Sequence, residues 1–229
     1  MTIRHALALA AALLLGTAQA ATVTLKMTDF SNGYGVVSTS LTGAGQFGAG
    51  RLAGQLTTNG FTDNSFVTYC TDLFQSFRWN AVYRDYSLVD TNTAHGFTTH
   101  QADLLGKLYT GFGDITNTNQ SVAFQLSVWE IVNETNAKLD VTTGYFKLNS
   151  YSSLMQVTLA NSWLTAINQA NVANFYNATR LYSPTAQDFV VFDAKPRNNG
   201  IHNTPEPSST VLVGAALAGL ALLRRRKPV

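Results

Sequence analysis

Charged side chains are scarce in this 229-residue sequence, of which Asp, Glu, Lys and Arg together make up only 12%. Cysteine is scarcer still, because the chain carries a single one, Cys70. One cysteine excludes a disulfide within the chain, and no cysteine or histidine has the neighbours that a zinc site requires. The sequence also lacks the clustered Lys and Arg of a nucleic-acid-binding surface. We therefore expect no metal, no other cofactor and no nucleic-acid partner.

Catalytic motifs are missing as well. No Gly-x-Ser-x-Gly nucleophile elbow is present, so nothing indicates a secreted hydrolase. The glycine-rich residues 43–50 lack the Gly-Lys-Ser/Thr ending of a phosphate-binding loop, and they predict a hairpin or bulge instead. His95 and His100 are expected to be solvated. The protein is therefore predicted not to be an enzyme.

Residues 1–20 have the three parts of a secretory signal peptide. Arg4 and His5 precede an apolar run over residues 6–15, and Ala18-Gln19-Ala20 has the small-x-small pattern of a cleavage site. The apolar run is too short to span a bilayer, which argues against an N-terminal membrane anchor. The sequence therefore predicts export.

The C-terminal residues form a second address segment. Pro205, Glu206 and Pro207 precede an apolar run over residues 211–223, which is followed by four basic residues, Arg224, Arg225, Arg226 and Lys227. Positive charge beside an apolar segment stays cytoplasmic, so the body of the chain would face outward across the inner membrane. This tripartite segment resembles the PEP-CTERM sorting signal of Gram-negative bacteria, and a simple tail anchor would have the same topology.

The resemblance implies that an exosortase-type enzyme processes the chain near Pro205-Glu206-Pro207. It also implies a transient inner-membrane intermediate, held by a transmembrane segment within residues 205–229, and a final place at the cell surface or outside the cell. Residues 195–204 are a polar linker. Residues 21–194 then form one extracellular domain, which we call the passenger.

The passenger is slightly acidic, although the whole chain has a pI near 8.7. Removing Arg4, Glu206 and the four C-terminal basic residues leaves 10 Lys and Arg against 12 Asp and Glu, from 15 and 13 in the whole chain. The basic character therefore belongs to the tail. A passenger of roughly 180 residues is long enough for one domain with a sizeable core.

Sequence patterns predict an α+β fold for the passenger. Alternating residues and turn signals such as Asn59-Gly60 predict strands at residues 23–27, 51–57, 66–73 and 83–89. A capping-box pattern from Thr98 to Gln101 predicts the start of a helix, and two more helices are expected at residues 122–132 and 152–170. Residues 187–192 predict a closing strand. We expect an N-terminal antiparallel β-sandwich or barrel-like sheet, a helical layer and a returning C-terminal strand.

The helix predicted at residues 122–132 places a polar side chain among apolar ones. Its broad apolar arc contains Val122, Phe124, Leu126, Val128, Trp129, Ile131 and Val132, and its narrow polar side contains Ser127, Glu130 and Glu134. Gln125 falls inside the apolar arc. Burying an amide without a partner costs about 1–3 kcal/mol, so Gln125 needs either a hydrogen-bond partner or a chemical role.

Cys70 and Gln125 together offer such a role, because a thiol and a carboxamide can lose ammonia to form an internal thioester. The motifs Tyr69-Cys70 and Phe124-Gln125-Leu126-Ser127-Val128-Trp129 resemble the Cys–Gln thioester domains of bacterial surface adhesins. The resemblance implies covalent attachment to surface amines or hydroxyls, with Tyr69, Phe124 and Trp129 shielding the acyl bond from water.

Two structural alternatives remain open for these residues. Cys70 would then be a small buried hydrophobic residue, and Gln125 would bond to a strand edge or loop backbone. The matching function is a reversible carbohydrate-binding or matrix-structural module, for which exopolysaccharide is the natural partner. A stacking surface formed by Trp79, Tyr83 and Tyr86 would serve it, although aromatic residues near strands are usually core.

Overall fold

The computed structural model describes residues 23–43, 45–169 and 172–196. The signal peptide expected at residues 1–20 and the sorting segment expected at residues 205–229 lie outside these residues. All helices and strands described belong to the unit Met1–Lys195. Within the described part of the chain, no helix combines the length and apolar character needed to cross a membrane.

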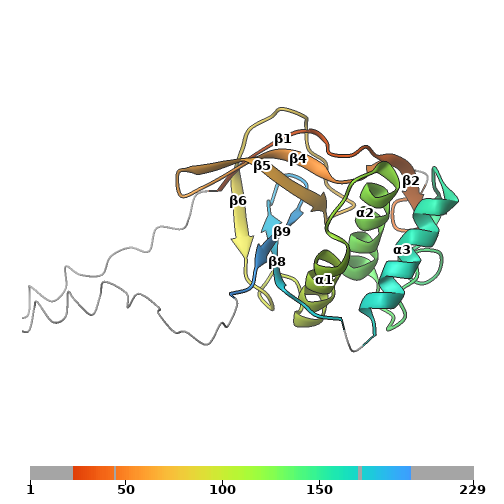
Figure 1. Cartoon of the computed structure of the whole chain (residues 1–229). Coiled ribbons are helices and arrows are strands. Elements are labelled where there is room, and N and C mark those ends of the chain that lie inside the picture. The colour runs from red at the N-terminus through yellow and green to blue at the C-terminus, as the bar shows by residue number, and fades with distance from the viewer. Residues whose placement is uncertain (1–22, 44, 170–171, 197–229) are drawn as a thin grey trace, which may run out of the picture. The chain divides into compact units, whose positions relative to one another are not determined.

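Six antiparallel strands close into a barrel. Their order around it is β1 (Val23–Phe30), β4 (Leu52–Thr58), β5 (Phe61–Cys70), β9 (Phe189–Ala194), β8 (Tyr176–Tyr182) and β6 (Tyr83–Val89). Strand β9 is the last of the described strands and inserts between β5 and β8 (Figure 1). The predicted barrel-like sheet and its returning C-terminal strand are thereby confirmed.

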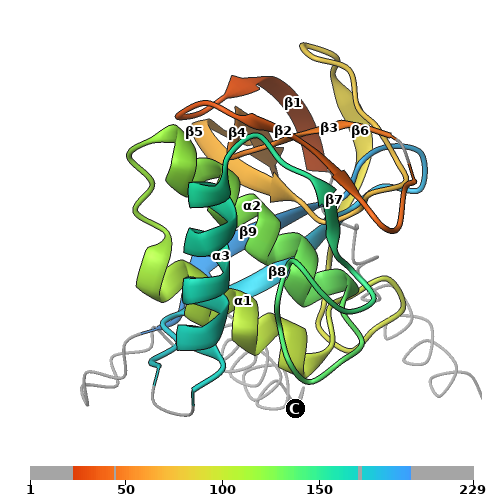
Figure 2. The same ribbon diagram turned by 90° about the vertical axis from the view of Figure 1, so that its right-hand side faces the viewer.

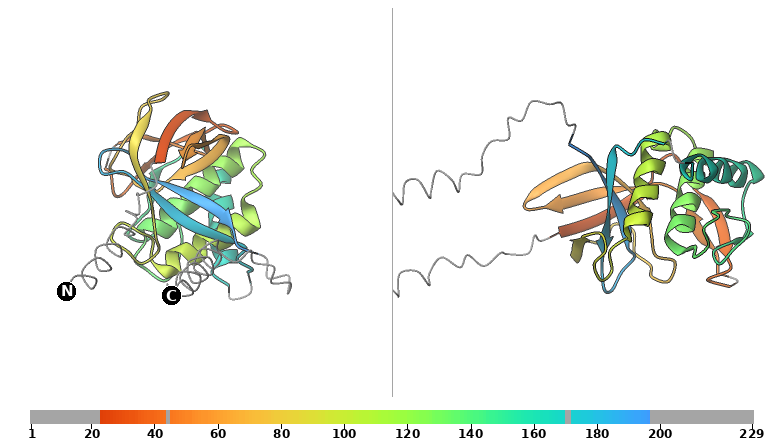
Figure 3. Two further views of the ribbon diagram at one scale, coloured as in Figure 1. Left: turned by 90° about the vertical axis from the view of Figure 1, so that its left-hand side faces the viewer. Right: turned by 90° about the horizontal axis from the view of Figure 1, so that it is seen from below.

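Three helices form a layer beside the barrel, which the view from below separates clearly (Figure 3, right). They are α1 (Thr99–Phe112), α2 (Thr118–Asn133) and α3 (Leu154–Ile167). Helix α2 packs against α1, α3 and β5, and α1 packs against β8, so two of the three helices contact the barrel. The predicted α+β class with a helical layer is therefore confirmed.

A second, three-stranded sheet covers part of the helical layer (Figure 2). Its order is β3 (Phe47–Ala49), β2 (Gly35–Thr39) and β7 (Leu148–Ser150). The glycine-rich residues predicted to form a hairpin run from the β2–β3 connection into β3, which pairs antiparallel with β2. The hairpin interpretation is confirmed.

Local sequence signals explain where two elements begin. The Thr98 hydroxyl accepts the backbone N–H of Gln101, and the Gln101 side chain accepts the N–H of Thr98, so the predicted capping box starts α1. At the β4–β5 turn, Asn59 and Gly60 both have positive φ, at 53° and 82°. These are the residue types that a two-residue hairpin turn requires.

Helix α2 is buried on almost every side. The polar side predicted from its sequence does not face solvent, because Ser127 and Glu130 are both 0% exposed. Residues 134–147 fold over this side. The Ser127 hydroxyl donates to the carbonyl of Ala123 one turn earlier, so it needs no outside partner. Gln125 therefore lies in the middle of a stretch, residues 121–131, in which every residue is buried.

Candidate functional site

Cys70 is the last residue of β5, at the point where this strand leaves the barrel. It pairs with Phe189 of β9, and the next N–H, that of Thr71, donates to the carbonyl of Asp188 at 2.9 Å. Beyond it the chain enters the connection to β6. Cys70 is 8% exposed, so a narrow part of its surface remains accessible.

The carboxamide of Gln125 is hydrogen-bonded on both sides to the backbone of Cys70. Its Oε1 accepts the Cys70 N–H at 2.9 Å, and its Nε2 donates to the Cys70 carbonyl at 2.8 Å. Both residues are buried, with Gln125 1% exposed. The structure thus brings together the two residues that the sequence singled out, 55 positions apart. Whether they condense to a thioester stays a prediction.

The residue before each member of this pair is aromatic and buried. Tyr69 and Phe124 are the neighbours of Cys70 and Gln125 in sequence, and their rings stack with centroids 4.3 Å apart. Phe124 also meets the edges of Phe192 and Trp163. Tyr69 and Phe124 are 1% and 0% exposed, so both rings are part of the core. The shielding role that the sequence suggested for them stays a prediction.

Burial of Cys70 controls its acid–base behaviour. Loss of hydration raises the pKa of the thiol far above its usual value, and the nearby carboxylate of Asp72 raises it further. The sulfur is therefore a neutral thiol at neutral pH, unlike the pre-ionised cysteines of thiol-dependent enzymes.

On its outer side Cys70 borders a pocket of about 510 Å³. Trp129, predicted to shield the site, lines this pocket and is only 2% exposed. The other aromatic lining residues come from the β1–β2–β3 region and from the loop after β5: Phe30, Tyr34, Phe47, Phe74, Phe77 and Trp79. Sequence reasoning missed most of these, because only folding brings the two segments together.

Trp79, Tyr83 and Tyr86, which the sequence suggested as a stacking surface, have different environments in the structure. Trp79 is 43% exposed and lines the pocket, whereas Tyr86 is buried and its hydroxyl donates to the carbonyl of Gln187 at 2.5 Å. Tyr83 accepts the backbone N–H of Arg78 through its hydroxyl. Of the three, only Trp79 lines the pocket beside Cys70.

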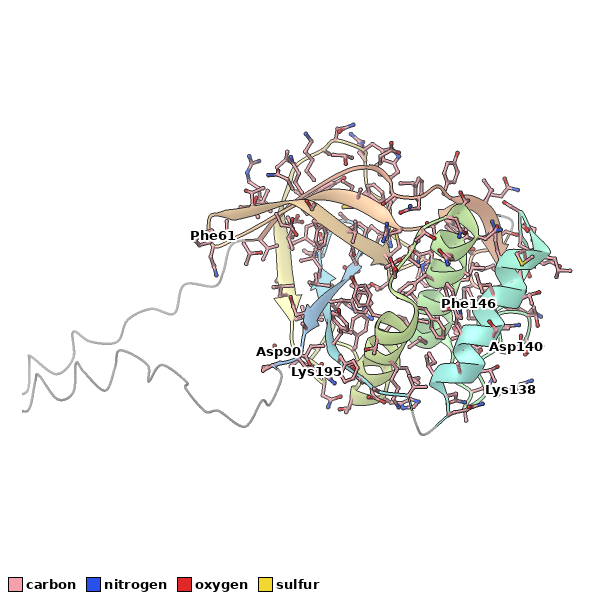
Figure 4. The ribbon with its side chains drawn as sticks, viewed as in Figure 1. Phe61, Asp90, Lys138, Asp140, Phe146 and Lys195 are labelled. Atoms are coloured by element: carbon pink, nitrogen blue, oxygen red, sulfur yellow. The ribbon has the colours of Figure 1, made fainter. Side chains whose placement is uncertain are left out.

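A cluster of carboxylates organises residues 134–147, which cover α2. Glu130 accepts the N–H of Asp140 at 2.7 Å, and Glu134 accepts those of Tyr145 and Phe146. Asp140 also pairs with Lys138 at 3.6 Å, and Figure 4 labels these two and Phe146. Burial raises the pKa of Glu130 to about 8. These acidic residues serve the fold of the loop.

Within the described residues, no cluster of His, Cys, Asp and Glu has the arrangement of a metal site. His95 stacks on the ring of Tyr182 with centroids 4.2 Å apart, which gives that histidine a packing role. Cys70 and Gln125 supply a thiol and a carboxamide, and the pocket beside Cys70 is lined mainly by aromatic and amide side chains.

Residues 203–227 match the PEP-CTERM protein-sorting motif. This match contains the predicted Pro205-Glu206-Pro207 motif and the basic residues from Arg224 to Lys227. The protein is therefore exported, processed by an exosortase and placed at the cell surface. The sorting assignment made from the sequence is confirmed.

Among solved structures, the N-terminal domain of the Streptococcus pyogenes pilus tip adhesin Cpa is similar to this chain. The alignment has 13% sequence identity and a TM-score of 0.41, and it covers 75% of this chain and 99% of the adhesin domain. We find no match to this sequence among curated proteins. A likeness this distant assigns no function.

Proposed function

We propose that the passenger is a non-enzymatic surface protein that attaches itself covalently through an internal thioester between Cys70 and Gln125. Sorting by the PEP-CTERM route delivers the domain to the outside, where such an attachment is useful. The observation that carries the proposal is the pair of hydrogen bonds between the Gln125 carboxamide and the Cys70 backbone. They hold the acyl carbon beside the residue whose sulfur would attack it.

Formation of the bond needs no outside reagent. The sulfur of Cys70 adds to the side-chain carbonyl carbon of Gln125, the C–N bond breaks, and ammonia leaves with the thiol proton. The backbone N–H of Cys70 already donates to Oε1, which is where negative charge develops in the tetrahedral intermediate. Apolar surroundings from Tyr69 and Phe124 keep water from the product.

In the attachment step the sulfur of Cys70 is the leaving group, whereas in thioester formation it is the nucleophile. A nucleophile of the target attacks the same carbonyl carbon, the C–S bond breaks, and the nucleophile's proton passes to the released thiolate. The target stays joined to Gln125 by an amide or ester bond. Because Cys70 borders the pocket, this is the side from which a target can approach.

Intact mass of the purified exported protein tests the proposal. We expect a mass lower by one ammonia than the sequence of the processed chain requires, and an adduct with methylamine that frees one thiol. Cys70→Ala and Gln125→Ala should each abolish the mass deficit and the adduct. A matched control is Gln156→Ala, because Gln156 is also a buried helical glutamine, 4% exposed, and lies in α3.

The competing structural interpretation predicts a different result. If Gln125 serves only as a buried hydrogen-bonding partner, protein purified at neutral pH or below will show its full mass and no methylamine adduct. Slow alkylation of Cys70 does not distinguish the two, because a buried thiol of raised pKa also reacts slowly. Full mass would leave a non-covalent surface module.

A further inference from the structure

The pocket beside Cys70 has a continuous aromatic wall. Tyr34 stacks on Phe30 with centroids 4.6 Å apart, Phe30 meets Trp79 at 5.3 Å, and Trp79 meets Phe77 at 4.8 Å. Each ring is held by the next, so the wall is preorganised. Tyr34 and Trp79 nevertheless keep 54% and 43% of their surfaces exposed. These two rings offer stacking faces to a ligand.

Little charge lines this pocket. Among its described lining residues the one formally charged side chain is Asp72, whose Oδ1 already accepts the N–H of Phe74 at 2.7 Å. The remaining polar groups are neutral and include the amides of Gln46, Gln75 and Gln187. A mixture of aromatic faces and neutral amides suits a ligand with apolar faces and hydroxyl edges.

We propose that this pocket binds a ring of a neutral polysaccharide, which stacks on Tyr34 and Trp79 and bonds through its hydroxyls to the neutral amide side chains of the lining. A pocket of about 510 Å³ is in the size range of small-ligand sites. Sugar rings have apolar C–H faces and hydroxyl edges, which is the chemistry that the aromatic wall and the neutral amides complement. This part of the inference is independent of the thioester.

A second part rests on the proposed function and names the acyl acceptor. One hydroxyl of the bound sugar attacks the side-chain carbonyl carbon of Gln125, the C–S bond breaks, and the hydroxyl proton passes to the sulfur of Cys70. The product is an ester between the sugar and Gln125 and a free thiol. Binding in the pocket supplies the local concentration that a weakly nucleophilic hydroxyl needs.

Binding is tested first in the exported Cys70→Ala protein, in which no thioester can form. Titration calorimetry with cellopentaose, maltopentaose and mannopentaose probes neutral sugars, and putrescine and pentagalacturonate probe cationic and anionic ligands. We expect a neutral pentasaccharide to bind and the ions not to. Adding Tyr34→Ala should weaken binding about tenfold or more. Tyr145→Ala is the matched control, because Tyr145 is 58% exposed and lies outside the pocket lining.

The outcomes separate this inference from the proposed function. Binding of putrescine alone, or of no neutral sugar, overturns the sugar site even where methylamine still forms its adduct with the wild-type protein. Sugar binding by the Cys70→Ala protein, combined with full mass of the wild type, refutes the thioester and leaves the sugar site in place. A sugar adduct of the wild type that hydroxylamine removes supports both, because hydroxylamine cleaves esters.

Discussion

The hydrogen bonds between Gln125 and Cys70 make a sharp prediction for the substitution Gln125→Glu. The change is nearly isosteric, but it replaces the Nε2 donor, which lies 2.8 Å from the Cys70 carbonyl, by an oxygen. We place it in a Cys70→Ala background, where no thioester can form. Both partner atoms at position 70 belong to the backbone, so that background retains them.

The cost of Gln125→Glu should depend steeply on pH. At pH 4 or below the introduced carboxyl is protonated and can still donate to the carbonyl, so we expect a loss below about 1 kcal/mol. An ionised carboxylate would face the carbonyl oxygen inside the core, and the folded state therefore keeps the proton. The pKa of the introduced carboxyl is thus higher in the folded state than in the unfolded state. The free energy of unfolding therefore falls as the pH rises above the pKa of the unfolded state. The loss grows by about 1.4 kcal/mol per pH unit.

Urea denaturation at pH 4, 5, 6 and 7 measures this difference between the two variants. By pH 7 we expect the doubly substituted protein to be about 3–4 kcal/mol less stable, if the acid remains protonated throughout. Gln120→Glu is the matched control, because Gln120 also lies in α2 but uses only its Oε1, as acceptor from Thr116. A loss for Gln125→Glu that stays constant from pH 4 to 7 would refute the bond to the Cys70 carbonyl.

Three further predictions follow from burial, titration and sorting. Trp129→Ala should lower the free energy of unfolding by about 3–5 kcal/mol, because the indole is 2% exposed; an unchanged urea midpoint would contradict its burial. Glu130 has a folded-state pKa of about 8, above its unfolded value, so it should destabilise the fold as pH rises from 4.5 to 8, and Glu130→Gln should flatten that part of the stability profile measured by urea melts. Replacing Pro205-Glu206-Pro207 should strand the chain at the inner membrane, and peptide mapping of exported protein should recover nothing from residues 211–229.

Local signals in the sequence predicted the elements whose ends are set by their own residues. The Thr98–Gln101 capping box and the Asn59-Gly60 turn are of this kind, and both are present in the structure. Strand β8, at Tyr176–Tyr182, was missed, because its alternation is broken by polar residues and it is defined by pairing with β6 and β9. Such pairing depends on segments far away in sequence.

The burial of Ser127 and Glu130, two polar residues of α2, could not be predicted from the sequence. A helical wheel places Ser127 and Glu130 on one side of α2, but it does not show that residues 134–147 cover that side. The pairing of Cys70 with Gln125 was predicted from a resemblance between motifs, and the polar partner that Gln125 required turned out to be the Cys70 backbone. The pocket could not be predicted, because Tyr34 and Trp79 come to line the same pocket through folding alone.

The insertion of β9 between two neighbours has a mechanical consequence. Six residue pairs join β9 to β8, and Val190 and Phe189 join it to the end of β5 at Tyr69 and Cys70. A domain bonded to its target at Gln125 and pulled by its C-terminal end would carry the tension along β9. Antiparallel hydrogen bonds run perpendicular to the strands, so such tension loads both ladders in shear and many bonds must yield together. Under flow, the last strand of the barrel would resist extraction for as long as both ladders hold.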